Sequence, residues 1–347
     1  MCITIATTKH PNYPFVLLSN RDEYYKRPTL AAHFRPIERE ETEAEARTGE
    51  GEEAKEKSTG EQILTPLDLA RPEHGTWIGV TTSGKMAVLV NYRDLDTQYN
   101  MKEISRGVLP LAFLNSPYSA AEWEKNITNK MQNGNAKIDL QKIGGFTLLY
   151  GDLNIDPETC KISHLNILSN RGHHGRVFET GLENDNATVS MSDSIATKST
   201  FGLSNSLYNH PWKKVFLGEE LVDTLVDSPK TENLSENEFV DECFKVLSHD
   251  TYSTKVAEKG DLNAKYLELR NSIFIPPVSL GDSHSTCASI GEFYGTRTQT
   301  VILLDKSGNL SYYEKNLHSV DTKVFDKPQI VSHYKFNIYE NKKEHDL

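Results

Sequence analysis

The chain has 347 residues, of which 37 % are hydrophobic, and it carries a formal net charge of −11. That length suffices for one large domain or two average ones, with a substantial core. The acidic balance argues against a non-specific nucleic-acid binder and against anchoring to anionic lipid through a basic patch.

The spacing of the cysteines and the hydropathy of the chain indicate the cellular compartment and the relation to membranes. The cysteines are widely spaced and form no CxxC pair, so the pattern indicates a reducing compartment and no zinc site. They are Cys2, Cys160, Cys243 and Cys287. No apolar run approaches the roughly 18 residues of a membrane span. The first residues lack the basic and apolar regions of a secretory signal. We therefore expect a cytoplasmic protein without a transmembrane segment.

The first two residues carry the most specific chemical signal. Cys2 is small, so removal of Met1 is expected, which leaves a cysteine with both a thiol and a free α-amine. An α-amine with a pKa of about 7.7–8.0 can act as a general base at neutral pH, so one residue can supply nucleophile and base. The alternative is that Cys2, in the apolar run Cys2–Ala6, is simply a packed core residue.

A polar cluster follows close behind. Pro14–Ser19 reads as a second strand, and the turn formers in Thr7–Tyr13 separate it from the first. The simplest arrangement is a hairpin, which places Asn20–Glu23 at the end of strand two, beside Cys2.

An acidic segment interrupts the ordered sequence. From Glu38 to Lys57 there are nine Glu against two Arg and two Lys, with no aromatic or β-branched aliphatic residue. Such a segment cannot offset its ordering entropy by burial. We expect a disordered acidic insertion in a surface loop at about residues 36–60.

The remaining elements are strands and two blocks of helices. Residues 74–82 and 85–93 predict a hairpin around Ser83-Gly84, and Met86–Val90 is apolar at every position, as in a strand covered on both faces. Helices are expected at 105–114, with Ser105 as cap, and at 119–132, 212–225 and 235–249. Further strands are expected at 144–152, 162–170, 200–206, 294–305, 310–314 and 334–338; residues 250–285 are ambiguous.

Hairpins with segregated helix blocks favour an α+β fold. Antiparallel sheets with helices packed outside fit a four-layer α/β/β/α sandwich, which accommodates the two-sided apolar strands. No linker is evident, so residues 1–347 are expected to form one domain.

Several polar residues at or near predicted strand ends make a plausible reaction centre. A carboxylate can orient the amine of Cys2, asparagine amides can donate to an oxyanion, and an arginine can grip a carboxylate or lower the thiol pKa. The candidates are Cys2, Arg21, Asp22, Asn91, Asn205 and Arg297. For Asn205 a turn role is as good an interpretation as an oxyanion role.

Six motifs in order connect the chain to a known group. They are Met1-Cys2-Ile3, Asn20–Tyr24 with Arg27-Pro28, Gly75–Gly79, Asn91-Tyr92, Gly202–Ser206 with Pro211-Trp212, and Gly295–Thr298. Together they resemble the NRDE family, also called the transport and Golgi organisation protein 2 family. The resemblance covers most of the chain except the acidic insertion. That family is itself similar to N-terminal-nucleophile hydrolases of the choloylglycine and penicillin-acylase type, which have the α/β/β/α fold and cleave non-peptide amides.

The resemblance to those hydrolases implies roles for individual residues. It makes Cys2 the nucleophile and base, and Asp22 the group that orients the amine. Asn91 and Asn205 would form the oxyanion site, and Arg297 would support the thiol. Arg21, Asn20 and Tyr92 are expected to contact a ligand. The sequence departs from the bile-salt type in one place: the arginine there precedes an Asn-x-Asp, whereas Arg21 lies between Asn20 and Asp22.

The resemblance also implies a cellular role. It suggests intracellular haem trafficking, lipid or acyl-CoA homeostasis and Golgi organisation, in the cytosol with mitochondrial or Golgi association. Haem would be a transported ligand, with no cofactor required. No CxxCH attachment motif is present, and His173-His174 would face opposite ways on a strand, which makes a poor chelate. The Cys2 thiolate could ligate haem iron.

Two functions from different classes therefore stay open, beside a third interpretation as a structural adaptor in the secretory pathway, for which the sequence shows no particular surface. The first is a carrier of haem or an acyl derivative on a hydrolase-like scaffold. The second is an N-terminal-nucleophile amidohydrolase or thioesterase that uses Cys2, Asp22 and Asn91. The sequence alone does not decide whether the protein is an enzyme.

Overall fold

The computed structural model describes residues 2–38, 60–93, 103–132, 138–179, 195–280 and 291–340. The predicted acidic insertion falls outside these ranges for residues 39–59.

The first sheet is antiparallel and holds the two ends of the described chain together. Its strands follow the order β10 (Thr200–Ser204), β1 (Ile3–Thr7), β2 (Phe15–Tyr24), β12 (Phe293–Leu304), β13 (Asn309–Asn316) and β14 (Val331–Asn337), and β11 (Val278–Ser279) pairs with β12. The hairpin of β1 and β2 is present as predicted, and β12 and β10 flank it on either side.

The second sheet follows chain order without a crossover. It runs β3 (Thr29–Pro36), β4 (Gln62–Asp68), β5 (Ile78–Thr81), β6 (Lys85–Asn91), β7 (Phe146–Asp152), β8 (Leu165–Ser169) and β9 (Gly175–Val177). The connection between β5 and β6 is tight: Gly84, which lies in it, has a φ of 98°, which only glycine adopts without strain.

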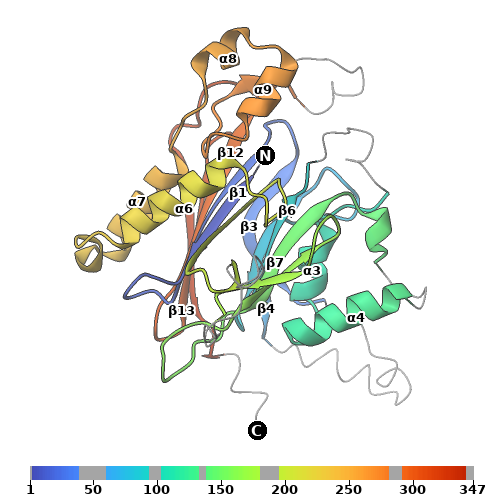
Figure 1. Cartoon of the computed structure of the whole chain (residues 1–347), viewed down its shortest axis with the longest axis vertical. Coiled ribbons are helices and arrows are strands. Elements are labelled where there is room, and N and C mark those ends of the chain that lie inside the picture. The colour runs from blue at the N-terminus through green and yellow to red at the C-terminus, as the bar shows by residue number, and fades with distance from the viewer. Residues whose placement is uncertain are drawn as a thin grey trace, which may run out of the picture.

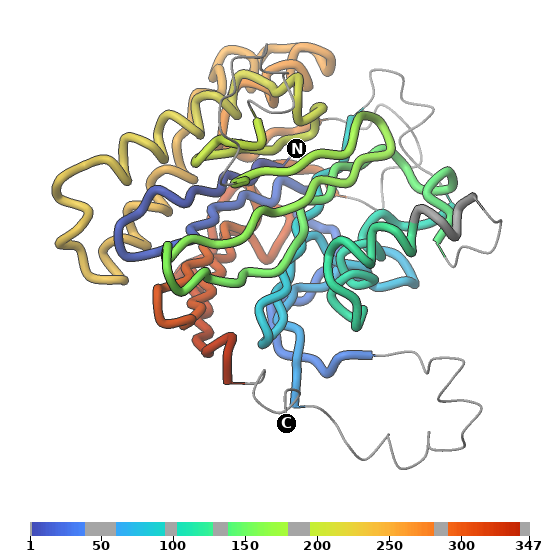
Figure 2. The backbone as a smooth tube through the Cα atoms, turned by 60° about the horizontal axis from the view of Figure 1, so that its bottom comes forward, coloured from blue at the N-terminus to red at the C-terminus, as the bar shows by residue number. Residues whose placement is uncertain are grey.

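Helices cover the outer face of each sheet. α6 (Lys213–Val226) and α7 (Glu236–Leu247) pack on the first sheet, and α3 (Val108–Leu114) and α4 (Ala120–Gln132) on the second. A third buried cluster fills the space between the sheets. Figures 1 and 2 show the two helix pairs on opposite sides of the strands. The predicted α+β class and four-layer α/β/β/α sandwich are confirmed.

Short elements complete the described chain. The ambiguous segment 250–285 contains α8 (Thr254–Lys259) and α9 (Leu262–Glu268), which begin after the side-chain caps Ser253 and Asp261. Single-turn 3₁₀ helices lie at Leu140–Lys142 and Thr231–Asn233. The α8–α9 region packs with the start of β12 in a fourth apolar cluster.

Among the sequence-based boundaries that were wrong, two have a clear physical reason. The helix expected from Ser105 begins at Val108, because the Ser105 hydroxyl accepts from the Gly107 amide in a preceding turn and Gly107 is the N-cap. The strand expected to end at Ser19 continues to Tyr24, because β12 pairs with it along its whole length. Asn20–Glu23 therefore lies within a strand, where successive side chains point to opposite faces.

Candidate active site

Cys2 lies at a rim of the first sheet. It directly precedes β1, whose Ile3 pairs with Asn20 on one side and Ser204 on the other. The Cys2 carbonyl accepts a hydrogen bond from Ser204 Oγ at 2.8 Å, and its thiol donates to the Asp22 carbonyl at 3.9 Å. The residue is partly buried and packs against the core between the sheets. Burial raises the pKa of the Cys2 thiol, Asp22 adds to the rise and Arg21 opposes it.

Each of the three oxygens of Asp22 has a neighbouring side chain in contact with it. Its Oδ1 accepts from Thr296 Oγ1 at 2.8 Å, and its carbonyl accepts from the Tyr294 hydroxyl at 3.0 Å. Its Oδ2 lies 3.6 Å from Lys214 Nζ. The carboxylate is therefore buried and held in place, and it belongs to the same residue whose carbonyl contacts the Cys2 thiol.

The sequence reasoning missed Lys214. It belongs to the first turn of α6, just after Pro211-Trp212, and its side chain is 0 % exposed. Burial lowers the pKa of its ammonium, while the nearby Asp22 and Cys2 charges raise it. A cation in the first turn of a helix opposes the helix dipole, but the exposed Lys213 shares that turn, so no signal in the sequence singles out Lys214 as the buried one.

Arg21 points to the other side of β2, toward the second sheet. Its guanidinium carbon lies 4.1 Å from the ring centre of Trp77, and Nη2 lies 3.8 Å from Glu23 Oε2. Its Nη1 is buried and has no hydrogen-bond partner among the described residues. Arg21 thus offers a stacked, pre-positioned donor that suits a carboxylate or phosphate.

Asn91 and Asn205 come together across the two sheets. Asn91 ends β6 and Asn205 follows β10; the Asn205 side-chain amide donates to the Asn91 carbonyl, and the Arg93 amide donates to the Asn205 carbonyl at 3.0 Å. Asn205 Oδ1 is buried without a hydrogen-bond partner in the described ranges. The asparagines thus link the sheets at this rim, and their role as oxyanion donors stays a prediction.

Arg297 and Tyr92 are engaged with the backbone around them. Arg297 donates to the carbonyls of His318 and Arg27, and burial lowers its pKa to about 10, with Arg21 adding to the effect. Tyr92 packs against Gly145, where a Cβ would meet its side chain at 2.9 Å. Support of the thiol by Arg297 and ligand contact by Tyr92 stay predictions.

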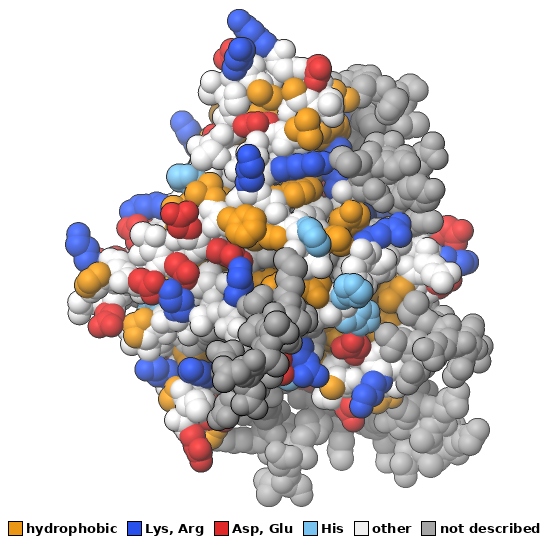
Figure 3. All heavy atoms as spheres, viewed as in Figure 1, with side chains coloured by type: hydrophobic (Ala, Val, Ile, Leu, Met, Phe, Trp, Pro, Cys, Tyr) orange, Lys and Arg blue, Asp and Glu red, His pale blue; other side chains and the backbone are white. Residues whose placement is uncertain are grey.

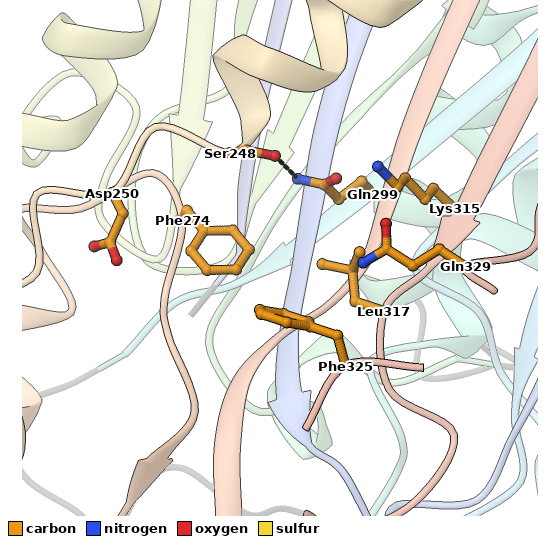
Figure 4. Close-up of a pocket in the computed structure, with 8 residues that line it drawn as sticks. All are labelled: Ser248, Asp250, Phe274, Gln299, Lys315, Leu317, Phe325 and Gln329. Carbon is orange, nitrogen blue, oxygen red and sulfur yellow. Dashed lines mark hydrogen bonds between the residues drawn. The ribbon is translucent and has the colours of Figure 1, made fainter. Parts of the chain in front are cut away.

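Asn20 faces the helix layer. Its amide donates to the carbonyls of Leu247 at 2.8 Å and Ile273 at 3.0 Å, at the end of α7 and before β11. Its partner across the strands is Gln299, which lines a hollow of about 340 Å³. Figure 4 shows the Gln299 amide bonded to Ser248, with Phe274 and Phe325 forming one wall. This hollow lies on the opposite face of β2 from Arg21.

The described residues provide neither a metal site nor a helix that could cross a membrane. In these ranges no group of three or more His, Cys, Asp or Glu side chains could hold a metal ion. His173 and His174 are exposed and precede β9 rather than lying on a strand, and His174 contacts Glu124 at 2.8 Å. Within the same ranges, every helix is too short or too polar to cross a membrane.

Comparison with known proteins places the chain in a family context. The family profile described as "Transport and Golgi organisation 2" matches residues 1–319. An uncharacterized protein of Saccharomyces cerevisiae is 29 % identical, with 93 % of this chain and 94 % of that protein covered. The "Transport and Golgi organization protein 2 homolog" is 27 % identical in Bos taurus (89 % and 88 % covered) and 26 % identical in Homo sapiens (94 % and 92 % covered).

A solved structure also matches along the whole chain. It is a mutant of conjugated bile acid hydrolase from Clostridium perfringens, with 12 % identity, a TM-score of 0.36, and 97 % of this chain and 98 % of that chain covered. A likeness at this score supports no argument about mechanism.

Proposed function

This chain belongs to the Transport and Golgi organisation 2 family, and we propose that it uses Cys2 for covalent chemistry on a small acyl compound. The reaction would be hydrolysis of a non-peptide amide or a thioester. The observation that supports this best is the position of Cys2 at a sheet rim, with its thiol 3.9 Å from the carbonyl of Asp22, whose carboxylate is buried and paired. Nucleophile and fixed charges at one rim are what acyl transfer requires.

The electrostatics explain why a base is needed. Burial raises the pKa of the thiol, so at neutral pH the sulfur keeps its proton unless a base removes it. The α-amine exposed by loss of Met1 belongs to the same residue and titrates near neutrality. We propose that the Asp22 carboxylate, which Lys214 and Thr296 also engage, orients that amine.

The proposed reaction has two balanced steps. The amine takes the thiol proton, and the thiolate attacks the acyl carbonyl carbon to form a C–S bond. The C–N or C–S bond to the leaving group then breaks, and the leaving group takes the proton from the amine. Water, deprotonated by the same amine, hydrolyses the thioester and restores the thiol. Asn91 and Asn205 are the proposed donors to the oxyanion, and Arg21 the proposed contact for an anionic group of the substrate.

Substrate turnover by matched variants tests this proposal. We expect Cys2→Ala to fold normally and to lose all hydrolysis of acyl-CoA thioesters and N-acyl amides. A preparation that retains Met1 should also be inactive, because its Cys2 nitrogen is an amide. Equal activity with and without Met1 would contradict the mechanism.

A second candidate is a carrier for an apolar ligand, haem or an acyl derivative. It is favoured by the partly buried Cys2 and Trp77, which both pack against the core between the sheets and offer an apolar wall beside the Arg21 cation. Figure 3 shows hydrophobic side chains among charged ones over the region of α6, α8 and α9. Cys2 is the proposed iron ligand if haem is bound.

The carrier proposal extends to location. From the family name and the resemblance, we propose a role in Golgi organisation with haem or lipid handling, in the cytoplasm with peripheral association at mitochondria or Golgi. A hemin titration that saturates, weakens in Cys2→Ala and is competed by acyl-CoA is the expected result. A titration without a saturable absorbance change would contradict haem carriage.

A further inference from the structure

We propose that Lys214 is a positioning residue of the Cys2 site: its buried ammonium pairs with Asp22 and so sets the charge that the thiol faces. This rests on the proposed use of Cys2 as a nucleophile and adds a residue to that site. Lys214 and Asp22 lie 192 positions apart in the sequence, yet Nζ and Oδ2 are 3.6 Å apart and both side chains are fully buried.

The contacts connect this pair to the sulfur in two steps. Lys214 Nζ meets the Asp22 carboxylate, and the Asp22 carbonyl accepts from the Cys2 thiol at 3.9 Å. The electrostatic interaction between Lys214 and Cys2 also affects the lysine, because a charge on Cys2 raises the pKa of the Lys214 ammonium. The three groups therefore form one electrostatic unit at the rim of the first sheet.

Stability does not account for such a pair. A buried ion pair adds little net stability over apolar side chains of similar size, because both ions lose their hydration. Lys214 is also placed in the first turn of α6, where the helix dipole disfavours a cation. A buried ion pair next to a thiol that adds little stability fits a functional role better than a structural one.

The other groups around the unit are mostly fixed in charge. Arg21 faces the thiol from the opposite side of β2 and opposes the rise in its pKa. The Tyr294 hydroxyl donates to the Asp22 carbonyl. Burial raises the pKa of the Tyr25 phenol far above neutrality, and the Asp22 charge raises it further, so Tyr25 stays uncharged. The charges that remain to set the field at Cys2 are thus its own amine and the Lys214–Asp22 pair.

The two members of the pair should act on the thiol with opposite sign. Without the ammonium, the Asp22 carboxylate disfavours a thiolate; without the carboxylate, the Lys214 ammonium favours one. A change of one unit in the thiol pKa alters the thiolate fraction about tenfold. A purely structural pair would instead give the same direction for both substitutions.

Alkylation of Cys2 by iodoacetamide between pH 6 and 10 measures this directly and needs no acyl turnover. Rates are read per cysteine by peptide mass spectrometry, with the exposed Cys160 as internal reference. At pH 7.5 we expect Lys214→Met to slow Cys2 alkylation about tenfold and Asp22→Asn to speed it by a similar factor. The double variant should return to within about threefold of the unaltered protein. Lys213→Met, its exposed neighbour on the same helix turn, should leave the rate unchanged.

Folding of the single lysine variant is not essential to the test. The double variant buries no unpaired charge. Asp22→Asn leaves the Lys214 ammonium without its carboxylate, so its rate is compared with that of Asp22→Asn plus Lys214→Met once circular dichroism shows that both proteins are folded. Slowing of about tenfold on adding Lys214→Met supports the proposal. Equal rates, or shifts in the same direction for both single variants, would overturn it. The alkylation rates could change as expected while neither the unaltered protein nor any variant hydrolyses an acyl compound. That outcome would support the role of Lys214 at Cys2 and reject the proposed hydrolase activity.

Discussion

The two helix–sheet interfaces of the sandwich are built from different chemistry. α3 and α4 meet the second sheet through interlocking aromatic rings: Phe113, Trp123 and Tyr150 contact one another edge-to-face, with centroids 5.1–5.3 Å apart. α6 and α7 meet the first sheet through an apolar cluster that is bordered by the Lys214–Asp22 pair and by the buried amides Asn20 and Gln299.

The difference separates a stabilising interface from a chemical one. Aromatic burial is favourable wherever it occurs, whereas each buried charge or unpaired amide oxygen costs free energy. Asn20 Oδ1 and Gln299 Oε1 are both buried without a hydrogen-bond partner in the described part of the chain. Sites that break the rules of core packing in this way tend to be functional, which directs attention to the first sheet.

The sharpest way to break this comparison is to remove the Lys214 charge. Lys214→Met leaves the Asp22 carboxylate buried without its cation, so we expect a loss of about 3–5 kcal/mol in the free energy of unfolding, measured in urea. Adding Asp22→Asn should restore most of it. The exposed control Lys213→Met should stay within about 0.5 kcal/mol of the unaltered protein. A Lys214→Met protein as stable as that control would contradict a buried ion pair.

On the α6–α7 side of the molecule, the change in unfolding free energy with pH should be nearly as large. His10 Nδ1 accepts from the backbone amides of Asn12 and Tyr13, and burial lowers the His10 pKa to about 4. The neutral ring is therefore favoured by folding. Its contribution is complete above pH 6.5 and is lost as pH falls toward 4, by about 3 kcal/mol in all.

The comparison with His10→Asn isolates this contribution. Asparagine keeps an acceptor near the two amides but does not titrate. Urea unfolding at several pH values should show a smaller loss of stability between pH 6.5 and 4 for the variant. Parallel curves for both proteins would exclude a buried neutral His10.

At the interface of α3 and α4 with the second sheet, one side-chain hydrogen bond should contribute measurably to the free energy of unfolding. The Tyr150 hydroxyl donates to Glu124 Oε2 at 2.8 Å from a fully buried ring. Tyr150→Phe keeps the ring packing and removes a bond to a charged acceptor, for an expected loss of about 1.5–3 kcal/mol. Tyr118→Phe, at an exposed position, is the matched control and should be nearly neutral. Iodoacetamide rates at Cys2 should not change in either variant.

The smallest expected effect concerns the start of α7. Ser235 and Glu238 form a capping box, in which Ser235 Oγ accepts from the Glu238 amide and Glu238 Oε2 accepts from the Ser235 amide. Ser235→Ala should cost about 1 kcal/mol in thermal or urea unfolding. Ser235→Asn keeps a capping acceptor and should recover most of that loss.

Local signals predicted much of the fold. Tight turns such as Ser83-Gly84 and Ser307-Gly308 depend on glycine with positive φ; the hairpin around the first and the two strands on either side of the second were predicted correctly. The start of β3 was not predicted, because much of Thr29–Pro36 is exposed and lacks an alternating pattern. The extension of β2 through Asn20–Glu23 depends on pairing with β12, some 270 residues away, which no local pattern reveals.

The candidate site shows the same division. Cys2 and Asp22 were predicted as neighbours from hairpin geometry, and the structure brings them into contact. Lys214 was missed because a lysine on an amphipathic helix normally faces solvent, and only the tertiary pairing with Asp22 shows that it is buried. The orientations of Asn205 and Arg297 were equally inaccessible, since backbone carbonyls of distant segments hold their side chains.

The measurement that tests the central claim most directly is the intact mass of the purified protein after incubation with acyl-CoAs and N-acyl amides, with Cys2→Ala in parallel. We predict that the unaltered protein lacks Met1 and gains an acyl adduct that the variant does not form. Loss of Met1 without an adduct in either protein would contradict covalent chemistry at Cys2 and would favour the carrier.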